Sequence, residues 1–472
     1  MDARMTATID VEHTDITEKI SDYAVSFSYA DASATSITAA KLFTLECLGH
    51  MLSGSRQPVG ALIMEMVRDL GAAEQVTVLG GPFRTSIAEA AYVNGTLAHA
   101  DELEACGTLP GTGLIPPITA GLAVGEARRS SGADYLAALI AGVEVQGRLG
   151  AAVIGACDRG FMGFALVGPA GAGVAAGKLV GLDSVGMRMC LGAALPLAGG
   201  SLRGDGYMSH VHEAGVPART GVWAALLAER GFTANPTYLD GPYSWGEQYV
   251  GPVANRPYNP GAILDGLGQS CFLETSDVAA KMYGASGVVH QAMEGVIRVM
   301  TEQQLRPEDL DSVRLVVPPF AERIASFHEP ATGEQAKFSL EQAVAGILVD
   351  GIPSVPYTAP FTDAGSRDER YVAARRRVDV SVDAALPNER GFAVQQVTVI
   401  LVDGTSHTTL VDRLDVPGRT GKPLSVDDRI AAFRRTADPL LGDQADRLVD
   451  IVMHFEKHSV GDIAEIVLPR SA

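Results

Sequence analysis

Basic charge, paired cysteines and long apolar runs are all scarce in this sequence, and each shortage excludes a class of protein. The 37 Lys and Arg residues are outnumbered by 56 Asp and Glu, and the formal net charge of −19 disfavours nucleic acid and anionic membranes as partners. Five cysteines without a CxxC pair favour neither a disulfide framework nor a structural zinc site, so a reducing compartment is expected. The acidic start is unlike a signal or transit peptide, and no uncharged apolar run approaches the roughly 20 residues of a membrane span. We expect a cytoplasmic protein.

The composition that remains is that of a globular protein with more than one domain. Of the 472 residues, 47% are hydrophobic and 20% are charged, which predicts two or three domains with full cores. Up to about residue 270 the apolar residues recur at helical spacing, and stretches rich in Ala and Gly indicate helices packed at close approach. Helices are predicted over residues 16–27, 36–51, 58–70, 86–94, 117–127, 133–149, 169–179 and 218–230.

The spacing of apolar residues changes after about residue 270. Strands with period-two alternation and many valines are predicted over residues 311–317, 377–382, 394–402 and 405–411, the last two joined by a hairpin turn at Asp403-Gly404. Further helices are predicted over residues 339–349, 427–435 and 445–455. The chain is therefore expected to be mainly α with an α+β part: helical over residues 1–268, an inserted α+β domain over 269–408, and helices again over 409–472. A cleft between the two parts is where a small-molecule site is expected.

The stretch NGTLAHADELEACGTLPGTGLIPP gathers more ionisable side chains than any other. If its first half is helical, His99, Glu102 and Cys106 share one face, whereas Asp101 and Glu104 point elsewhere. A proton acceptor, a carboxylate and a thiol in line before a Gly/Pro-rich loop are compatible with the edge of an active site. They are equally compatible with a helix whose polar face lies in solvent.

Several blocks of the sequence together resemble the MmgE/PrpD family, which contains 2-methylcitrate dehydratases, cis-aconitate decarboxylases and iminodisuccinate epimerases. The resemblance extends, in order, from about residue 37 to residue 433. It is carried by the blocks TVLGGPFRTSIAEAAYVNGTLAHADELE, AALIAGVEVQGRLG, GPAGAGVAAGKLVGLD, RTGVWAALLAERGFT, AKFSLEQAVAGILVDG and GKPLSVDDRIAAF.

The resemblance implies a fold, an assembly and a chemistry. The fold is a large all-helical domain built from both chain ends, with a smaller α+β lid domain inserted. The assembly is a homodimer that binds no cofactor. The shared chemistry is removal of a proton from the carbon beside a carboxylate of a small organic acid, followed by elimination, decarboxylation or reprotonation.

Part of the family's site pattern is present. Asn94 and His99 match an Asn-Gly…His pattern, and Glu102 stands at the first acid of an Asp-x-Asp-Asp-Thr run in which Cys106 replaces the threonine. Lys281 is retained from a Lys-Pro-Tyr-Pro-Cys…Arg motif. Two further positions keep the family residue, Tyr283 and His290, and Gln342 stands where the family has a tyrosine.

Four other positions depart from the pattern in the same direction. Histidines are replaced by Leu109 and Met162, an arginine by Gly287 and a lysine by His210; an alignment shifted by one residue would instead place His212 at a family histidine. Since di- and tricarboxylates are bound by charge-assisted hydrogen bonds from cations, these losses predict a substrate less anionic than methylcitrate or aconitate.

These residues lead to a hypothesis of a cofactor-independent lyase. His210 or His212 would take the α-proton near neutral pH, Lys281 would steady the developing negative charge, and Glu102 would position the substrate or protonate the leaving group. Substrate contacts are expected from His99, Cys106, Tyr207, Tyr283 and Gln342, with packing as the alternative role for the histidines and for Cys106. On a strand His210 and His212 would share a face that suits a metal, but no further ligand cluster is visible, so no metal is expected.

Two other functions remain open at this point. An isomerase could reprotonate the same carbanion from the opposite face, without net loss of mass. A homologue without catalysis could serve as a binding or scaffold protein, although the retained His99, Glu102 and Lys281 argue against decay of the site.

Overall fold

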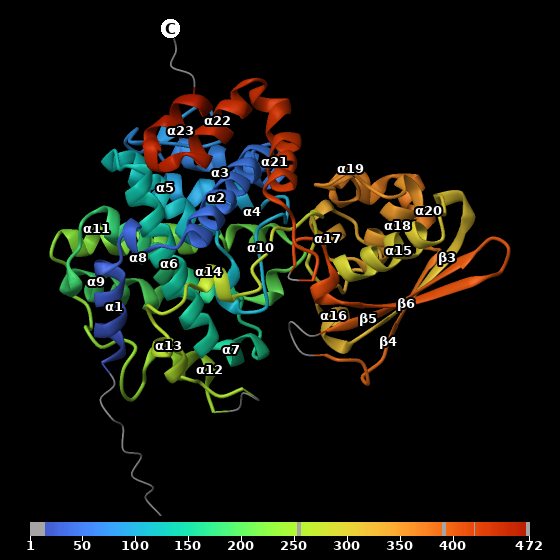
Figure 1. Cartoon of the computed structure of the whole chain (residues 1–472), viewed down its shortest axis with the longest axis horizontal. Coiled ribbons are helices and arrows are strands. Elements are labelled where there is room, and N and C mark those ends of the chain that lie inside the picture. Colours follow the sequence, from blue (N-terminus) through green and yellow to red (C-terminus); the bar gives the residue numbers. More distant parts are fainter. Residues whose placement is uncertain (1–14, 253–255, 389–392, 420, 469–472) are drawn as a thin grey trace, which may run out of the picture.

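The computed structural model describes residues 15–252, 256–388, 393–419 and 421–468, which form a large helical domain and a smaller lid domain beside it (Figure 1). Helices from the amino-terminal part of the helical domain are α1 (Ile16–Ser26), α2 (Ala34–Gly54), α3 (Pro58–Asp69), α4 (Ile87–His99), α5 (Ile115–Arg128), α6 (Gly132–Ala152), α7 (Ile154–Asp158), α8 (Gly163–Leu179), α9 (Ser184–Ala194), α10 (Met208–His212), α11 (Gly215–Glu229), α12 (Trp245–Val250), α13 (Gly261–Leu264) and α14 (Phe272–Thr275). Two short strands, β1 (Val76–Thr77) and β2 (Arg84–Thr85), pair before α4.

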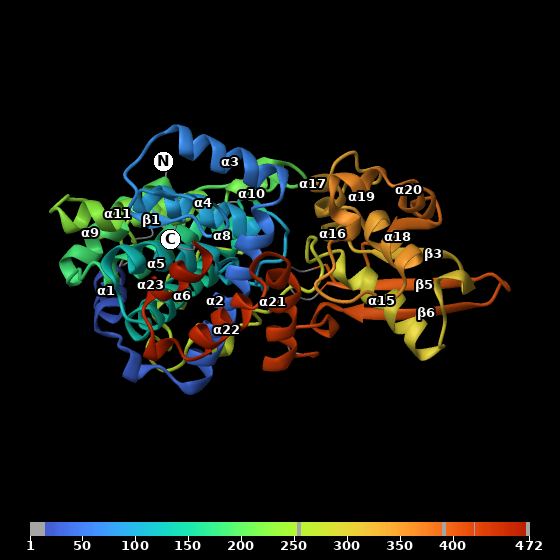
Figure 2. The ribbon, with the colours of Figure 1, turned by 90° about the horizontal axis from the view of Figure 1, so that it is seen from above.

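Both ends of the chain build the helical domain. The carboxy-terminal helices are α21 (Val426–Leu441), α22 (Gln444–Met453) and α23 (Val460–Val467). The first two pack on α2 and the third on α5, as Figure 2 shows from above. Helix α21 begins with the predicted capping box, in which the Ser425 and Asp428 side chains each bond the other residue's backbone.

Close packing in the centre of the helical domain depends on small residues. Helix α8 is apolar on all sides and lies among α5, α6 and α11. A Cβ atom added to Gly221 of α11 would lie 2.4 Å from the backbone nitrogen of Gly173 in α8. One added to Gly142 of α6 would lie 2.6 Å from the carbonyl oxygen of Gly171. The Ala/Gly-rich stretches therefore serve close helix contact, as the sequence indicated.

The lid domain, residues 283–415, covers one face of a four-stranded sheet with helices. Its strands β3 (Leu310–Val317), β4 (Val378–Val382), β5 (Val394–Leu401) and β6 (Ser406–Asp412) lie in the order β4-β3-β5-β6, with only the β3–β4 pair parallel. Its helices are α15 (His290–Glu302), α16 (Pro319–Ile324), α17 (Gly333–Ala336), α18 (Leu340–Asp350), α19 (Asp363–Arg367) and α20 (Glu369–Arg375), of which α15 and α18 pack on the sheet. The predicted strands and the turn at Asp403-Gly404 are confirmed, and β6 runs across the expected boundary at residue 409.

The two domains meet near the end of α4, beside α10 and α17 (Figure 2). From the lid, Lys337 donates a 2.6 Å hydrogen bond from Nζ to the carbonyl oxygen of Ala100. The ring of Phe327 meets Tyr207 edge-on at 6.0 Å between centroids. These contacts close the junction over the end of α4, where the chemically distinctive residues gather. Within the described ranges, no helix is both long and apolar enough to cross a bilayer.

The α8–α11 contact yields a test of the packing argument. Gly221→Ala should lower the free energy of unfolding by about 1–3 kcal/mol, because the new methyl group meets backbone that cannot move aside. Gly461→Ala, within helix α23, is the matched control. The nearest atom to its added Cβ is Ser459 Oγ, at 3.6 Å. Thermal unfolding followed by circular dichroism should show a lower midpoint for the first variant only; equal midpoints would contradict the packing argument.

Candidate functional site

The site begins where helix α4 stops. The sequence predicted a helix over residues 86–94 and left open whether it continued toward Cys106. Helix α4 ends at His99, and Glu102 adopts a left-handed backbone with φ of 55°. The Glu102 amide donates to the His99 carbonyl oxygen at 3.0 Å, which closes a turn in place of a further helical turn. Because Lys337 from the lid binds the Ala100 carbonyl oxygen, a tertiary contact satisfies a group that the helix leaves free. The turn returns Glu102 to His99, with Oε2 3.4 Å from Nε2.

Lys281 reaches the same place from a loop far along the chain. Cys106 and Ala279 exchange two backbone hydrogen bonds, of 3.0 and 3.1 Å, and so align the two segments. Two residues beyond this bridge, Lys281 Nζ lies 2.9 Å from Glu102 Oε1 and 2.5 Å from Glu104 Oε1. Glu104 was expected to point elsewhere; that expectation is wrong, because the non-helical turn brings both glutamates to one side.

Helix α10 brings a further histidine, His210, to the same place. His210 Nε2 lies 3.2 Å from Glu102 Oε2, and its Nδ1 lies 3.1 Å from Asp205 Oδ1. The His210 ring also meets His99 at 4.7 Å between centroids and the edge of Phe338 at 5.3 Å. His99, Glu102, Glu104, His210 and Lys281 thus form one group, called the buried cluster below; each is at most 6% exposed.

Opposite charges set the protonation of three members of the cluster. Burial raises the pKa of Glu102, but the charges of Lys281 and His210 outweigh it and hold that pKa well below its usual range. Burial likewise disfavours the charged forms of Lys281 and His210. The glutamates nevertheless raise the pKa of Lys281, and Glu102 with Asp205 raises the pKa of His210 well above its usual value. Lys281 and His210 are therefore cations at neutral pH, and Glu102 is an anion.

The other two members are shifted toward their neutral forms. Burial lowers the pKa of His99 to about 3, so its imidazole is uncharged. Burial and the neighbouring charge of Glu102 raise the pKa of Glu104 to about 7, against the opposing effect of Lys281. The cluster therefore holds groups that can give, take or hold a proton close to neutral pH.

Two residues expected in the site lie outside it. On α10 the side chains of His210 and His212 diverge, and His212 Nδ1 lies 3.0 Å from the hydroxyl oxygen of Tyr92. Because a helix carries the two histidines, they do not share the face that a strand would give them. Tyr207, 54% exposed, meets the ring of Phe327 edge-on at the domain junction.

The other residues expected in the site bond to neighbouring segments of the protein. Tyr283 hydrogen-bonds Glu294, Gln342 Nε2 donates to Pro360 O at 2.7 Å within the lid, and Arg419 Nη2 lies 3.2 Å from Cys106 Sγ. His290 Nε2 lies 3.0 Å from the carbonyl oxygen of Ala285, and burial lowers its pKa to about 3. These contacts join the segments around the cluster.

Several residues near the cluster carried no signal in the sequence. Asp205 precedes α10, whereas Lys337 and Phe338 are neighbours between α17 and α18, and only the fold brings them together with His210. Arg419 donates from Nη1 to the carbonyl oxygen of Cys106 at 2.7 Å and lies 3.8 Å from where a Cβ of Gly287 would be. A guanidinium therefore stands beside the position at which the resemblance implied a lost arginine.

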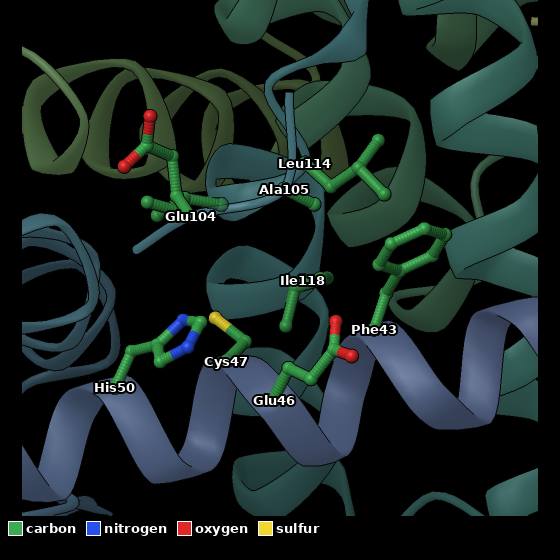
Figure 3. Close-up of a pocket in the computed structure, with 9 residues that line it drawn as sticks. Phe43, Glu46, Cys47, His50, Glu104, Ala105, Leu114 and Ile118 are labelled. Atoms are coloured by element: carbon green, nitrogen blue, oxygen red, sulfur yellow. The ribbon is translucent and has the colours of Figure 1, made fainter. Parts of the chain in front are cut away.

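A cavity lies on the α2 side of the Glu104 segment. Phe43, Glu46, Cys47 and His50 of α2 line it together with Glu104, Ala105, Leu114, Ile115 and Ile118 (Figure 3). Glu46 is neutralised by Arg429 at 2.5 Å, and His50 is uncharged because burial, with Lys281, lowers its pKa to about 3. In Figure 3 the Glu104 carboxylate turns away from α2. Most of the cavity wall is therefore apolar or uncharged.

The arrangement combines functions that carbanion chemistry needs. The Lys281 ammonium can steady negative charge that develops on a substrate oxygen, and the His210 imidazolium can deliver a proton. Aromatic and aliphatic neighbours exclude water, which strengthens both effects.

Two family models and several known proteins match this chain. The family model for the MmgE/PrpD N-terminal domain matches residues 18–256, and that for the MmgE/PrpD C-terminal domain matches residues 283–457. A cis-aconitate decarboxylase from Homo sapiens is 26% identical over 441 residues, covering 89% of this chain and 87% of that protein. A cis-aconitate decarboxylase from Aspergillus terreus is 22% identical over 465 residues, covering 94% and 93%.

The charge balance around Lys281 makes a stability prediction. Lys281→Met should lower the free energy of unfolding by about 3–5 kcal/mol, because it leaves buried carboxylates without their cation. Lys281→Met/Glu104→Gln should recover part of that loss, since one carboxylate is then neutral. Arg314→Met, which removes an exposed 3.7 Å pair with Asp379, is the control and should change stability by less than about 1 kcal/mol. Thermal unfolding at pH 8 measures all three, and a double variant no more stable than Lys281→Met would contradict the coupling.

Proposed function

The chain belongs to the MmgE/PrpD family, and on that premise we propose that it is a lyase that decarboxylates a small organic acid. The relatives named as cis-aconitate decarboxylases cover most of the chain and support a lyase at the level of the reaction class. The reaction uses side chains of the buried cluster. Its substrate is less anionic than aconitate.

One observation carries the choice of decarboxylation. His210 lies 3.2 Å from Glu102 and 3.1 Å from Asp205, so its imidazole is flanked by carboxylates and holds a proton. Loss of carbon dioxide leaves its electron pair on carbon, and the carbon then needs an acid and a neighbouring cation but no base. His210 is therefore the proton donor, which replaces the role of base inferred for it from the sequence.

In the proposed reaction, Lys281 stabilises the negative charge that develops on the substrate. Its ammonium contacts both Glu102 and Glu104 at hydrogen-bonding distance and is buried, where electrostatic interactions are strong. A substrate carboxylate or carbonyl oxygen near Nζ would gain stabilisation as negative charge develops on it. Glu102, bound to both cations, is a positioning residue that holds Lys281 and His210 in place.

Charge supports a substrate with few carboxylates. Glu102, Glu104 and Asp205 already surround the two cations, so each further anionic group would meet repulsion. A mono- or dicarboxylate suits this environment better than a tricarboxylate.

The reaction is tested with a panel of unsaturated mono-, di- and tricarboxylic acids and their half-esters in deuterated buffer. We expect NMR to show release of carbon dioxide and deuterium on the carbon that lost it. His210→Gln should lower kcat about 100- to 10,000-fold, because the proton donor is lost. His212→Gln, two residues away on the same helix but outside the cluster, should keep kcat within a few-fold of the unaltered chain.

The possible results separate the parts of the proposal. Deuterium exchange without loss of mass would replace the lyase by an isomerase. Equal loss of activity in His210→Gln and His212→Gln would contradict the assignment of His210. Turnover of a tricarboxylate faster than that of any half-ester would contradict the substrate class but not the reaction.

A further inference from the structure

His99 has a buried lone pair that faces two carboxylates. Its Nδ1 lies 3.2 Å from the carbonyl oxygen of Val211, which can only accept, so Nδ1 carries the hydrogen and Nε2 the lone pair. Nε2 is buried and has no hydrogen-bond partner among the described residues. It lies 3.4 Å from Glu102 Oε2 and 3.7 Å from Glu104 Oε2, and the latter oxygen also has no partner within the described ranges. Acceptors that face one another in a buried site are stabilised by a proton or a cation between them.

The neighbouring His210 completes a set of metal-ligand atoms around the same space. His210 Nε2 lies 3.2 Å from Glu102 Oε2, and ligand atoms of His99, Glu102 and His210 all lie within 4.8 Å of one another. In a tetrahedral zinc site, bonds of about 2.0–2.2 Å place the ligand atoms about 3.3–3.6 Å apart. The two nitrogen–oxygen separations, 3.4 and 3.2 Å, are close to that spacing, and the two histidine nitrogens lie within 4.8 Å of each other.

Each ligand side chain has a second polar atom, on the side away from the shared space, that lies near another residue. Metal-binding histidines donate their other ring N–H to a carbonyl or carboxylate, and metal-binding carboxylates are themselves hydrogen-bonded. Here Val211 O faces His99 Nδ1 and Lys281 binds Glu102 Oε1. The carboxylate of Asp205 lies close to His210, with Oδ1 3.1 Å from Nδ1, although the two atoms are not aligned as a hydrogen bond. Two of the three ligands therefore have the outer contact that orients them, and the third has a carboxylate beside it.

We propose that His99, Glu102 and His210 bind one divalent cation of the zinc type. Two imidazoles and a carboxylate are the donor set that zinc accepts and that magnesium and calcium, which prefer all-oxygen sites, do not. The charges agree, because with neutral imidazoles the carboxyl groups of Glu102, Glu104 and Asp205 outnumber the single ammonium of Lys281. This reverses the expectation of no metal, which rested on the lack of a further ligand cluster in the sequence and on the absence of a cofactor that the family resemblance implies.

The site goes beyond the proposed reaction and excludes it while occupied. A cation on His210 Nε2 takes the lone pair that otherwise carries the proton, and that proton leaves to solvent. The metal-bound chain therefore lacks the donor that decarboxylation needs. Metal binding is measured without substrate, so failure of either proposal leaves the other standing.

The test uses the full chain freed of metal with a chelator that is then removed by dialysis. Titration with Zn²⁺ in a calorimeter, with elemental analysis after gel filtration, should give one tightly bound ion per chain. Co²⁺ should occupy the same site and show visible absorption bands of tetrahedral or five-coordinate cobalt. Mg²⁺ and Ca²⁺ should not compete.

Three substitutions and one control locate the ion. His99→Gln and His210→Gln should abolish the tight site, and Asp205→Asn should weaken it about 10- to 100-fold, because it removes an outer contact. His212→Gln should bind as the unaltered chain does. Weak binding at exposed histidines such as His454 and His458 should persist in every variant.

The proposal is overturned if the metal-free chain takes up no tightly bound Zn²⁺, or if His99→Gln retains the same affinity and stoichiometry. Circular dichroism checks that each variant is folded. Should both histidine variants fail to fold, Glu102→Gln decides, because it removes the ligand carboxylate and unchanged affinity there would overturn the site.

Discussion

The ammonium of Lys281, buried between the carboxylates of Glu102 and Glu104, is the contact on which the site depends. An isolated buried charge is strongly destabilising, so each of these groups tolerates burial only because the others are there. The same contact joins the turn after α4 to the loop after α14. Structural integrity and chemical reactivity therefore rest on one set of charges.

The domain junction makes this arrangement possible. Lys337 of the lid caps a free carbonyl at the end of α4, and Phe338 covers one face of His210. The left-handed backbone of Glu102, unfavourable for a residue with a side chain, persists because these tertiary contacts surround it. Strain of this kind at a buried group of charges is typical of a functional site.

Protons and metal ions compete for the same groups in such a site. His210 holds a proton between two carboxylates, whereas His99 directs an unprotonated nitrogen at the same Glu102 oxygen. Proposals of a decarboxylase and of a zinc site describe two occupants of this space. Which occupant prevails depends on the free metal concentration, since both need the lone pair of His210.

The sequence by itself determined the elements with regular periodicity and most of the domain order. Period-two alternation identified β3, β5 and β6, and the Ser425–Asp428 pair marked the start of α21, because these signals are local. Lys281, His99 and Glu102 were identified through motifs. The role of Glu104, the separation of His212 from His210 and the contribution of Asp205 were decided only by the tertiary structure. The turn that follows α4 is bound by Lys337, a residue more than 200 positions away, and no local pattern records a contact of that kind.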